Sequence, residues 1–556
     1  MEAGSVRRWL WAFILVTSAD SSNQAAFQKA IGPGFVFQAS KTDAKFLIEA
    51  MGGGVAMFDA DRDGKLDLFF ANGAALHAGM KNGAVADKSD RKFWNRLYRN
   101  KGDGTFEDIT ERAGVRGTGY SQGVAAVDCD NDGNTDLFVT GLAGNHLYRN
   151  KGGGVFEDVT PIADVAGGGW STSAGFLDYD RDGNLDLFVA RYLDWDFGKN
   201  KRCGAEGADM QAYCHPNEFA AVTHLLYRGL GGCRFADVST KSGIAKAPGK
   251  GLGVAFQDAD GDGWTDIFVA NDSFPQQLFR NNGDGTFEET GLAMGVAYDE
   301  NGGTFAGMGT DFADYNNDGR PDIFVNALAN QGYALFQNRG GKLFEYVSGP
   351  SGLAAISKLH SGWGTRFLDY DNDGWKDIFV AQSHVMDNIE RTQPTLRYSE
   401  KPVLLRNAGG KFTDVSPRAG EPFQVPLIGR GAAFGDLDSD GAVDIALSVL
   451  DGAARVFRNN AAPNGNHWLS IQTIGTKSNR DGIGAAITVT TPSGRIQTGF
   501  VSTAGSYLSS HDKRVHFGLG EERVATVAIR WPSGTTQTLR NVATDRVLTV
   551  TEEVKQ

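Results

Sequence analysis

Short apolar runs, separated by turns rich in glycine and aspartate, fill most of the chain. A typical unit begins with an apolar run containing Gly, such as 54–58 or 253–257, and resumes after an acidic turn with a second run, such as 136–139 or 266–269. A Leu-Tyr-Arg-Asn segment, a Gly-rich turn and Phe-Glu-Asp-Val-Thr follow, most clearly in 97–110 and 147–160. Apolar and aromatic runs bounded by Gly and Asp are typical of strands joined by hairpins. Each unit therefore predicts four short antiparallel strands.

The unit repeats along the chain. The acidic turn, Asp-x-Asp/Asn-x-Asp-Gly-x-x-Asp, occurs seven times, starting at residues 59, 128, 178, 258, 314, 369 and 436. Regular repetition of a four-stranded unit is the signature of a β-propeller. We therefore predict an all-β fold, with a seven-bladed β-propeller over residues 20–463.

The last unit lacks its fourth strand. Strands are expected near 431–435, 443–449 and 454–458, but no Phe-x-Asp-Val-Thr segment follows them. An apolar segment, 35–39, precedes the first unit and belongs to no other. We expect 35–39 to complete the last blade, because closing the ring in this way removes an exposed strand edge.

Residues 464–556 have a different pattern. Apolar residues alternate in 468–474, 484–490, 496–502, 524–531 and 545–551, with Pro-Ser-Gly turns at 492–494 and 532–534. Alternation with turns predicts a small β-sandwich-like domain. Arg480 and Trp531 are candidates for its contact with the propeller, with simple burial of Trp531 as the default interpretation.

Composition supports a folded, turn-rich protein. The 556 residues include 74 glycines and are 41% hydrophobic, which excludes a disordered or collagen-like chain. At the N-terminus, Arg7 and Arg8 precede an apolar run, 9–16, and the small residues 17–19. This predicts a signal peptide at 1–19 and a secreted, periplasmic or cell-surface protein, with an uncleaved anchor or a twin-arginine signal as alternatives.

Four cysteines are too few for a disulfide scaffold, but an exported chain can oxidise them. Three of them lie between 203 and 233, in a loop-rich stretch. We expect Cys203 to pair with Cys214, although the sequence by itself allows three pairings.

The acidic turns carry metal-binding chemistry. Carboxylates stand at positions 1, 3, 5 and 9, a glycine at position 6 allows a sharp reversal, and position 7 offers its carbonyl oxygen. An all-oxygen set without His or Cys selects a hard cation, and its flexibility suits Ca²⁺ better than Mg²⁺. We expect about one Ca²⁺ per turn, up to seven. The expected ligands are Asp59, Asp61, Asp63, Lys65, Asp67; Asp128, Asp130, Asp132, Asn134, Asp136; Asp178, Asp180, Asp182, Asn184, Asp186; Asp258, Asp260, Asp262, Trp264, Asp266; Asp314, Asn316, Asp318, Arg320, Asp322; Asp369, Asp371, Asp373, Trp375, Asp377; and Asp436, Asp438, Asp440, Ala442, Asp444.

The net charge of −13 agrees with this expectation, because bound dications would offset the aspartates. The acidity therefore does not require a basic partner, and no nucleic-acid partner is expected. The alternative, that the turns are only Asp-Gly turns, is hard to reconcile with seven copies of identical spacing.

The repeats and several C-terminal motifs resemble those of a known family. The repeated units resemble the FG-GAP/VCBS repeats of integrin α-subunit propellers, and 479–485, 515–520 and 531–534 resemble the ASPIC and UnbV domain. Together with 51–59 and the 213–216 insertion, these motifs look like the cartilage acidic protein family. The calcium-binding EGF module of its animal members is absent, which suggests a bacterial-type member. The resemblance implies extracellular calcium binding and interaction, and no established catalysis.

Ligand candidates lie on the long insertions, 71–96, 190–225 and 381–403, which we expect on the face opposite the acidic turns. They are Arg191, Tyr192, Asp194, Trp195, Asp196 and His384, for which loop packing and local capping is the competing interpretation. No catalytic motif is found, so the predicted function is a non-enzymatic binding or adhesion module for an extracellular protein or glycan, without a stable membrane span after signal cleavage. The alternative is a carbohydrate-active enzyme, such as a calcium-dependent polysaccharide lyase.

Overall fold

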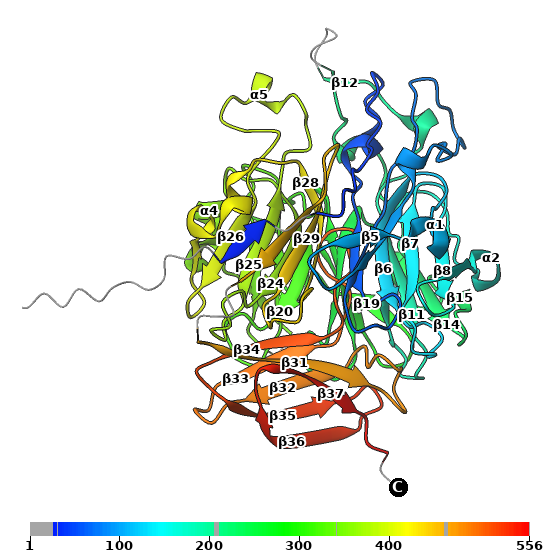
Figure 1. The fold of residues 1–556 in the computed structure, drawn as a ribbon. Helices are drawn as coiled ribbons and strands as arrows, with labels where there is room; N and C mark the ends of the chain where they lie inside the picture. Colours follow the sequence, from blue (N-terminus) through cyan, green and yellow to red (C-terminus); the bar gives the residue numbers. More distant parts are fainter. Residues whose placement is uncertain (1–25, 30–31, 205–210, 341, 461–464, 555–556) are drawn as a thin grey trace, which may run out of the picture.

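A computed structural model describes residues 26–29, 32–204, 211–340, 342–460 and 465–554. The expected signal peptide, 1–19, and the expected domain boundary at 463/464 lie outside these residues. The described chain is built from strands, with only short helical turns in the connections (Figure 1). The expected all-β, propeller-type fold is confirmed.

Seven antiparallel four-stranded sheets make up the larger part of the described chain, and each contains one of the acidic turns between its first two strands. Their strands are β2 (Val55–Phe58), β3 (Asp67–Phe70), β4 (Arg96–Asn100), β5 (Phe106–Asp108); β6 (Ser121–Val127), β7 (Asp136–Gly141), β8 (His146–Asn150), β9 (Phe156–Asp158); β10 (Ser171–Leu177), β11 (Asp186–Arg191), β14 (Leu225–Gly229), β15 (Phe235–Asp237); β16 (Gly251–Gln257), β17 (Asp266–Asn271), β18 (Gln277–Asn281), β19 (Phe287–Glu289); β20 (Thr310–Ala313), β21 (Asp322–Val325), β22 (Ala334–Asn338), β23 (Phe344–Tyr346); β24 (Gly362–Leu368), β25 (Asp377–Gln382), β26 (Val403–Asn407), β27 (Phe412–Asp414); and β28 (Gly429–Gly435), β29 (Asp444–Val449), β30 (Arg455–Asn459), β1 (Phe27–Lys29).

The sheets are arranged around an axis. The first strand of each sheet packs beside the first strand of the next, and β28 of the last sheet packs beside β2 of the first. Apolar side chains from facing sheets, such as Phe138 with Phe176 and Phe188 with Phe256, fill the spaces between them. Because both faces of these strands are buried, their sequences are continuous apolar runs rather than alternating apolar and polar residues.

An asparagine at the end of the third strand joins most neighbouring sheets. Its side-chain amide donates to the carbonyl at position 2 of the acidic turn in the preceding sheet, as from Asn150 to Ala60 (2.8 Å). We call this bond the amide latch. It also joins Asn281 to Tyr179, Asn338 to Ala259, Asn407 to Tyr315, Asn459 to Tyr370 and Asn100 to Leu437.

The N-terminal segment does complete the last sheet, but with a strand other than the one expected. β1, residues 27–29, pairs antiparallel with β30. Segment 35–39 makes only isolated bridges to that sheet, through Val36 and Phe37. Phe35 and Phe37 are instead buried in the core near the first sheet, where Phe35 stacks on Phe70. The expectation that 35–39 forms the closing strand was therefore wrong, since 27–29 forms it. The aromatic side chains of 35–39 are more stable buried in the core beside the first sheet than they would be at a sheet edge.

The long insertions connect second to third strands, as expected. α5 (Ile389–Thr392) and β12 (Cys203–Gly204), which belong to two of them, lie at the end of the propeller opposite the C-terminal strands (Figure 1). The remaining short elements are β13 (Gln211–Ala212), α1 (Thr110–Ala113), α2 (Thr160–Ala163), α3 (Ser348–Ser351), α4 (Leu353–Ser357), η1 (Leu47–Ala50), η2 (Arg91–Phe93), η3 (Phe197–Lys199), η5 (Pro216–Glu218), η6 (Ile244–Lys246), η7 (Ser416–Arg418) and η8 (Glu421–Gln424).

Two disulfides cross-link the propeller. Cys203 bonds to Cys214 within one insertion, the pairing expected from the sequence. Cys129 bonds to Cys233 across 104 residues, and this second pairing joins the acidic turn of one sheet to the outer hairpin of the next. All four cysteines are therefore oxidised.

The C-terminal residues form two sheets packed face to face. β31 (His467–Ile474) lies between β34 (Val515–Gly520) and β37 (Arg546–Thr551), and the second sheet has the order β33 (Ile496–Phe500), β32 (Ala486–Thr490), β35 (Val524–Arg530), β36 (Thr536–Ala543). Alternate side chains such as Ile471, Val489 and Val527 are buried between the sheets. The sequence pattern did not indicate β34 and β36.

A loop of the C-terminal domain occupies the axis of the propeller. Ser506 N donates to Thr310 O, Ser510 N donates to Val55 O, and the Tyr507 hydroxyl donates to Met51 O. These partners lie on or beside the first strands of different sheets. Residues 506–510 thereby fill the centre of the ring, and they meet the N-terminal segment there.

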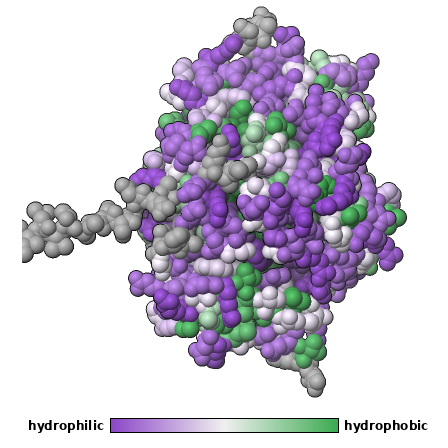
Figure 2. Space-filling view, in the orientation of Figure 1, coloured by the Kyte–Doolittle hydropathy of each residue, from purple (hydrophilic) through white to green (hydrophobic). Residues whose placement is uncertain are grey.

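On the face shown in Figure 2, hydrophobic residues are scattered among hydrophilic ones. Within the described residues, no helix has the length and apolar character needed to cross a bilayer.

Candidate metal centre

The acidic turns share one backbone geometry, which places their carboxylates around a common point. In the third turn, Asp178 at position 1 accepts a hydrogen bond from the amide of Gly183 at position 6 (3.2 Å). Position 4, Arg181, has φ of 59°, and Gly183 has φ of 84°. The left-handed backbone at positions 4 and 6 folds the chain back over position 1, which explains the glycine at position 6. The position 1–6 bond is present in all seven turns.

The aspartate at position 9 anchors each turn to its sheet. Asp136 accepts from the amide of Cys129 at position 2 (2.9 Å) and from the amide of Asn150 at the end of the third strand (2.7 Å). The same pair of bonds recurs at every position 9. Position 9 is thus a structural residue as well as a candidate ligand, a role that the spacing did not reveal.

Several carboxylate oxygens in the turns have no hydrogen-bond partner although they are buried. In the third turn these are Oδ1 of Asp178 and Oδ1 of Asp180, and oxygens of Asp178, Asp180 and Asp186 lie within 4.8 Å of one another. The fourth turn leaves Asp258 Oδ1 and Asp260 Oδ2 without a donor, and the sixth leaves Asp371 Oδ1. Buried oxygens without donors, facing one another, fit a hard cation such as Ca²⁺.

Electrostatics leads to the same conclusion. Burial raises the pKa of Asp136 to about 8, and the neighbouring carboxylates Asp130 and Asp128 raise this pKa further. Two hydrogen bonds from backbone amides lower the pKa, but they only partly offset these effects. Burial likewise raises the pKa of Asp322 to about 8 and that of Asp67 to about 7. Carboxylates held together out of water resist ionisation unless a cation compensates them.

The charged and aromatic side chains at position 7 contact neighbours in or beside the turns. Lys65 pairs with Asp63 (2.8 Å) and Arg320 pairs with Asp318 (2.6 Å), while the ring of Trp264 stacks with the guanidinium of Arg181. These side chains offer no ligand atom. The expectation for position 7 concerns only its carbonyl oxygen.

The C-terminal domain covers the face that carries the acidic turns. Arg530 pairs with Asp258 (2.8 Å), and Thr498 donates to Asp314 (3.2 Å). The amide of Arg480 donates to Asn131 (2.7 Å), so the expected contact of Arg480 is present. Trp531, in contrast, is buried within the C-terminal domain and packs over Gly482.

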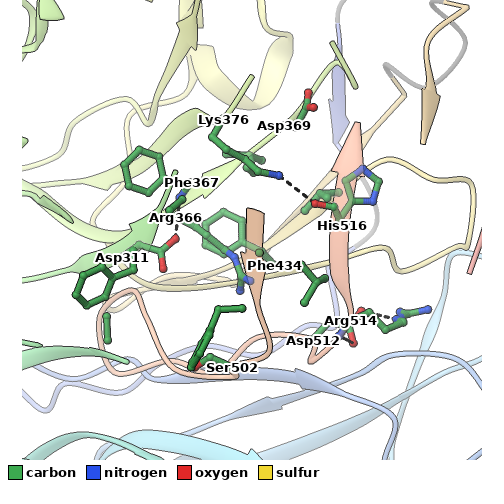
Figure 3. A pocket seen from close by; sticks show the side chains of 18 of the residues that line it. Asp311, Arg366, Phe367, Asp369, Lys376, Phe434, Ser502, Asp512, Arg514 and His516 are labelled. Carbon is green, nitrogen blue, oxygen red and sulfur yellow. Dashed lines mark hydrogen bonds and ion pairs between the residues drawn. The ribbon is translucent and has the colours of Figure 1, made fainter. Parts of the chain in front are cut away.

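A cavity of about 120 Å³, lined by both charged and apolar side chains, lies between the two domains (Figure 3). Asp311, Arg366 and Lys376 from the propeller and Asp512, Arg514 and His516 from the C-terminal domain face it. Lys376 donates to the carbonyl of His516 (3.0 Å), and Arg514 pairs with Asp512 (2.5 Å). Asp314, Asp369 and Asp436, each at position 1 of a turn, also line the cavity, so it borders three of the candidate metal sites.

The ligand candidates on the opposite face do not form a binding surface. Tyr192 and Trp195 are fully buried, and Trp170 packs against both rings. The Tyr192 hydroxyl donates to Asp272 (2.5 Å). A ligand therefore cannot stack on these rings, and the expectation was wrong because the insertions pack on one another and on the N-terminal segment.

The other members of that set have local roles. Asp196 caps η3 by accepting from Gly198 N and Lys199 N, and Asp194 pairs with Lys199. His384 is buried, its Nδ1 accepts from the Met386 amide, and burial lowers its pKa to about 4. The amide of Arg191 donates to His224. Local capping and packing therefore explain Asp194, Asp196 and His384, whereas Nε of Arg191 is buried without a hydrogen-bond partner.

Comparison with known families now adds to this geometry. Residues 475–556 match the ASPIC and UnbV family, and residues 83–139, 128–189, 258–325 and 314–380 match the FG-GAP-like repeat. The chain is thus a protein of FG-GAP repeats followed by an ASPIC/UnbV domain. It is homologous to cartilage acidic protein 1 over about half of its length.

The human cartilage acidic protein 1 is 27% identical over 321 residues, which are 57% of this chain and 46% of that protein. The chain spans about half the length of these relatives. Mouse integrin alpha-7 is 31% identical over 113 residues, 19% of this chain and 9% of that protein. The shared segment is therefore a small part of the integrin.

Among solved structures, an exotype rhamnogalacturonan lyase matches with a TM-score of 0.37 and 11% identity, covering 74% of this chain and 72% of that one. A similarity of this size says nothing about ligands or chemistry.

Proposed function

We propose that the chain is an exported calcium-binding propeller that acts as a non-enzymatic binding or adhesion module for an extracellular protein or glycan. The observation that carries the calcium half is the set of buried, donor-free carboxylate oxygens repeated in the acidic turns. When bound, Ca²⁺ would be held by aspartates at positions 1, 3, 5 and 9, with Asn316 at position 3 of the fifth turn. The ion would supply the charge that lets these carboxylates stay ionised while buried.

The binding half rests on the FG-GAP repeats and the homology to cartilage acidic protein 1. Two disulfides support export, because structural disulfides persist in oxidising compartments. For a lyase, a base and a cation would have to face a cleft. The insertions do not provide one, since His384 is buried and the neighbouring aromatic residues pack inside the protein. The cavity between the domains does hold Lys376, Arg514 and His516, but its volume of about 120 Å³ is too small for a polysaccharide.

Thermal unfolding tests the proposed calcium binding. The purified chain is heated in excess Ca²⁺, in excess Mg²⁺ and in chelator, and bound metal is counted after dialysis. Binding to the folded state predicts a large rise in Tm with Ca²⁺, a smaller rise with Mg²⁺ and several bound ions. Equal Tm values with no bound calcium would refute metal binding.

Glycan and protein arrays test the binding half, with product analysis on every glycan retained. Capture without cleavage supports a binding module. Release of unsaturated products would instead establish the lyase alternative.

A further inference from the structure

In several sheets, an arginine on the third strand contacts the acidic turn of the same sheet. It is the Arg of the Leu-Tyr-Arg-Asn segment. Arg99 pairs with Asp61 (2.6 Å) and Asp63 (3.1 Å), at positions 3 and 5 of the first turn. Arg228 pairs with Asp180 (2.7 Å) and Asp182 (2.9 Å) in the third turn.

The sixth and seventh turns repeat the contact. Arg406 pairs with Asp371 (3.1 Å) and Asp373 (2.7 Å), and Arg458 pairs with Asp438. Arg280 approaches Asp260 at 4.0 Å in the fourth turn. In the second sheet, the corresponding Arg149 pairs with Glu157 instead (3.1 Å).

The fifth sheet departs from this pattern in two residues at once. Its turn has Asn316 in place of the position 3 aspartate, and its third strand has Gln337 in place of the arginine. One negative and one positive charge are therefore missing together. Paired loss is expected if the arginine serves the charge at position 3, and has no reason to occur if the arginine serves only the outer surface.

In the third and sixth turns the arginine contacts one side of the position 3 carboxylate. It binds Oδ2 of Asp180 and Oδ2 of Asp371, and Oδ1 of each is buried and has no donor. The guanidinium thus holds the outer oxygen and leaves the inner one directed toward the other carboxylates of the turn. A planar guanidinium that spans positions 3 and 5 suits this task, because its fork fixes two carboxylates at once.

We infer that the third-strand arginine is a positioning residue of the acidic turn: it offsets the charge at position 3 and orients that carboxylate inward. The part of this inference that concerns metal affinity rests on the calcium binding proposed above. Charge compensation acts in the metal-free protein too, so it can be tested separately.

The test compares three variants of the full chain in chelator and in Ca²⁺. The first is R99Q/R228Q/R406Q, and the second adds D61N/D180N/D371N, which copies the fifth turn into three others. In chelator the first variant should melt about 2–4 °C below the parent, because three turns gain uncompensated charge. The second should recover to within about 1 °C of the parent.

The control variant is R116Q/R339Q, which removes two arginines that pair with surface glutamates, Glu111 and Glu345. It should leave Tm unchanged within about 1 °C, because both partners of each control pair are exposed, whereas the aspartates of the acidic turns are not. In Ca²⁺ the first variant should show a larger calcium-dependent rise in Tm than the parent, because the dication replaces the missing charge.

Two results would overturn the inference. One is a fall in Tm of the first variant in chelator that the added asparagines do not reverse. The other is an equal fall in Tm of the control variant. If the parent shows no calcium response at all, the proposed function fails. The chelator comparison still decides whether the arginines compensate position 3.

Discussion

The side-chain amide of Asn100 donates a 2.8 Å hydrogen bond to the carbonyl of Leu437, a residue 337 positions further along the chain. This amide latch joins the first sheet to the last. The same asparagine uses its backbone amide to bind Asp67 at position 9 of its own turn. One residue therefore ties the candidate metal site of the first sheet to the closure of the ring.

Replacing Asn100 by Ala should destabilise the protein by about 1–3 kcal/mol, because a buried carbonyl loses its donor. Urea unfolding followed by tryptophan fluorescence measures the change. The exposed Asn282 provides a control, and its replacement by Ala should cost about 0.5 kcal/mol or less. A loss no greater than that of the control would contradict a closing role for the latch.

The junction between the second and third sheets has no amide latch, because Gly229 stands where the other sheets have asparagine. The Cys129–Cys233 disulfide joins the same two segments there. Replacing both cysteines by Ser should cost about 4 kcal/mol, since the bond closes a loop of 104 residues.

The matched control is the Cys203→Ser, Cys214→Ser variant, whose disulfide spans only 11 residues. Its loss should be smaller, about 2–3 kcal/mol, because the entropy of loop closure grows with loop length. Equal losses, or a larger one in the control, would show that the long disulfide does not stabilise this junction.

The calcium-dependent rise in Tm should increase with pH. Burial raises the pKa of Asp67 to about 7 and those of Asp136 and Asp322 to about 8, well above unfolded values near 4. A raised folded pKa gives stability that is present at acidic pH and is lost as pH rises through the folded pKa. Without metal, these groups therefore destabilise the protein increasingly from about pH 4 to pH 8.

Bound Ca²⁺ should remove that penalty. The difference in Tm between Ca²⁺ and chelator is expected to be several degrees larger at pH 8 than at pH 5.5. Taking this difference cancels the pH-dependent contribution of buried histidines such as His384, because that contribution is the same in Ca²⁺ and in chelator. A difference independent of pH would mean that these aspartates do not ionise on metal binding.

The axial loop should couple the two domains. Tyr507 is fully buried, packs edge-on against Trp363 at 5.0 Å and donates to Met51 O (2.9 Å). Tyr507→Phe should cost about 1–2 kcal/mol through the unpaired carbonyl. Tyr507→Ala should cost about 3–5 kcal/mol through the cavity it leaves.

Limited proteolysis in the 501–515 region is the readout that distinguishes docking from general stability. The alanine variant should expose this region at temperatures where the propeller remains folded. Uniform cleavage along the chain would instead indicate that the ring itself had opened.

Much of the repeat could be predicted from the sequence because its signals are local. Glycine at position 6 and the fixed spacing of aspartates depend only on the conformation of a nine-residue turn, and the strands beside it depend on short apolar runs. The arginine that pairs with Asp180 and Asp182 was visible in the repeated segment, yet nothing local showed that its side chain reaches the turn.

What the sequence by itself determined is the repeated unit: four strands and an acidic turn whose carboxylates are candidate ligands for a cation. Only the tertiary structure decided that 27–29 rather than 35–39 completes the last sheet, that Tyr192 and Trp195 are buried, and that a C-terminal loop fills the axis. These outcomes depend on contacts between residues far apart in the chain, where burial of large side chains competes among many sites that look alike in the sequence.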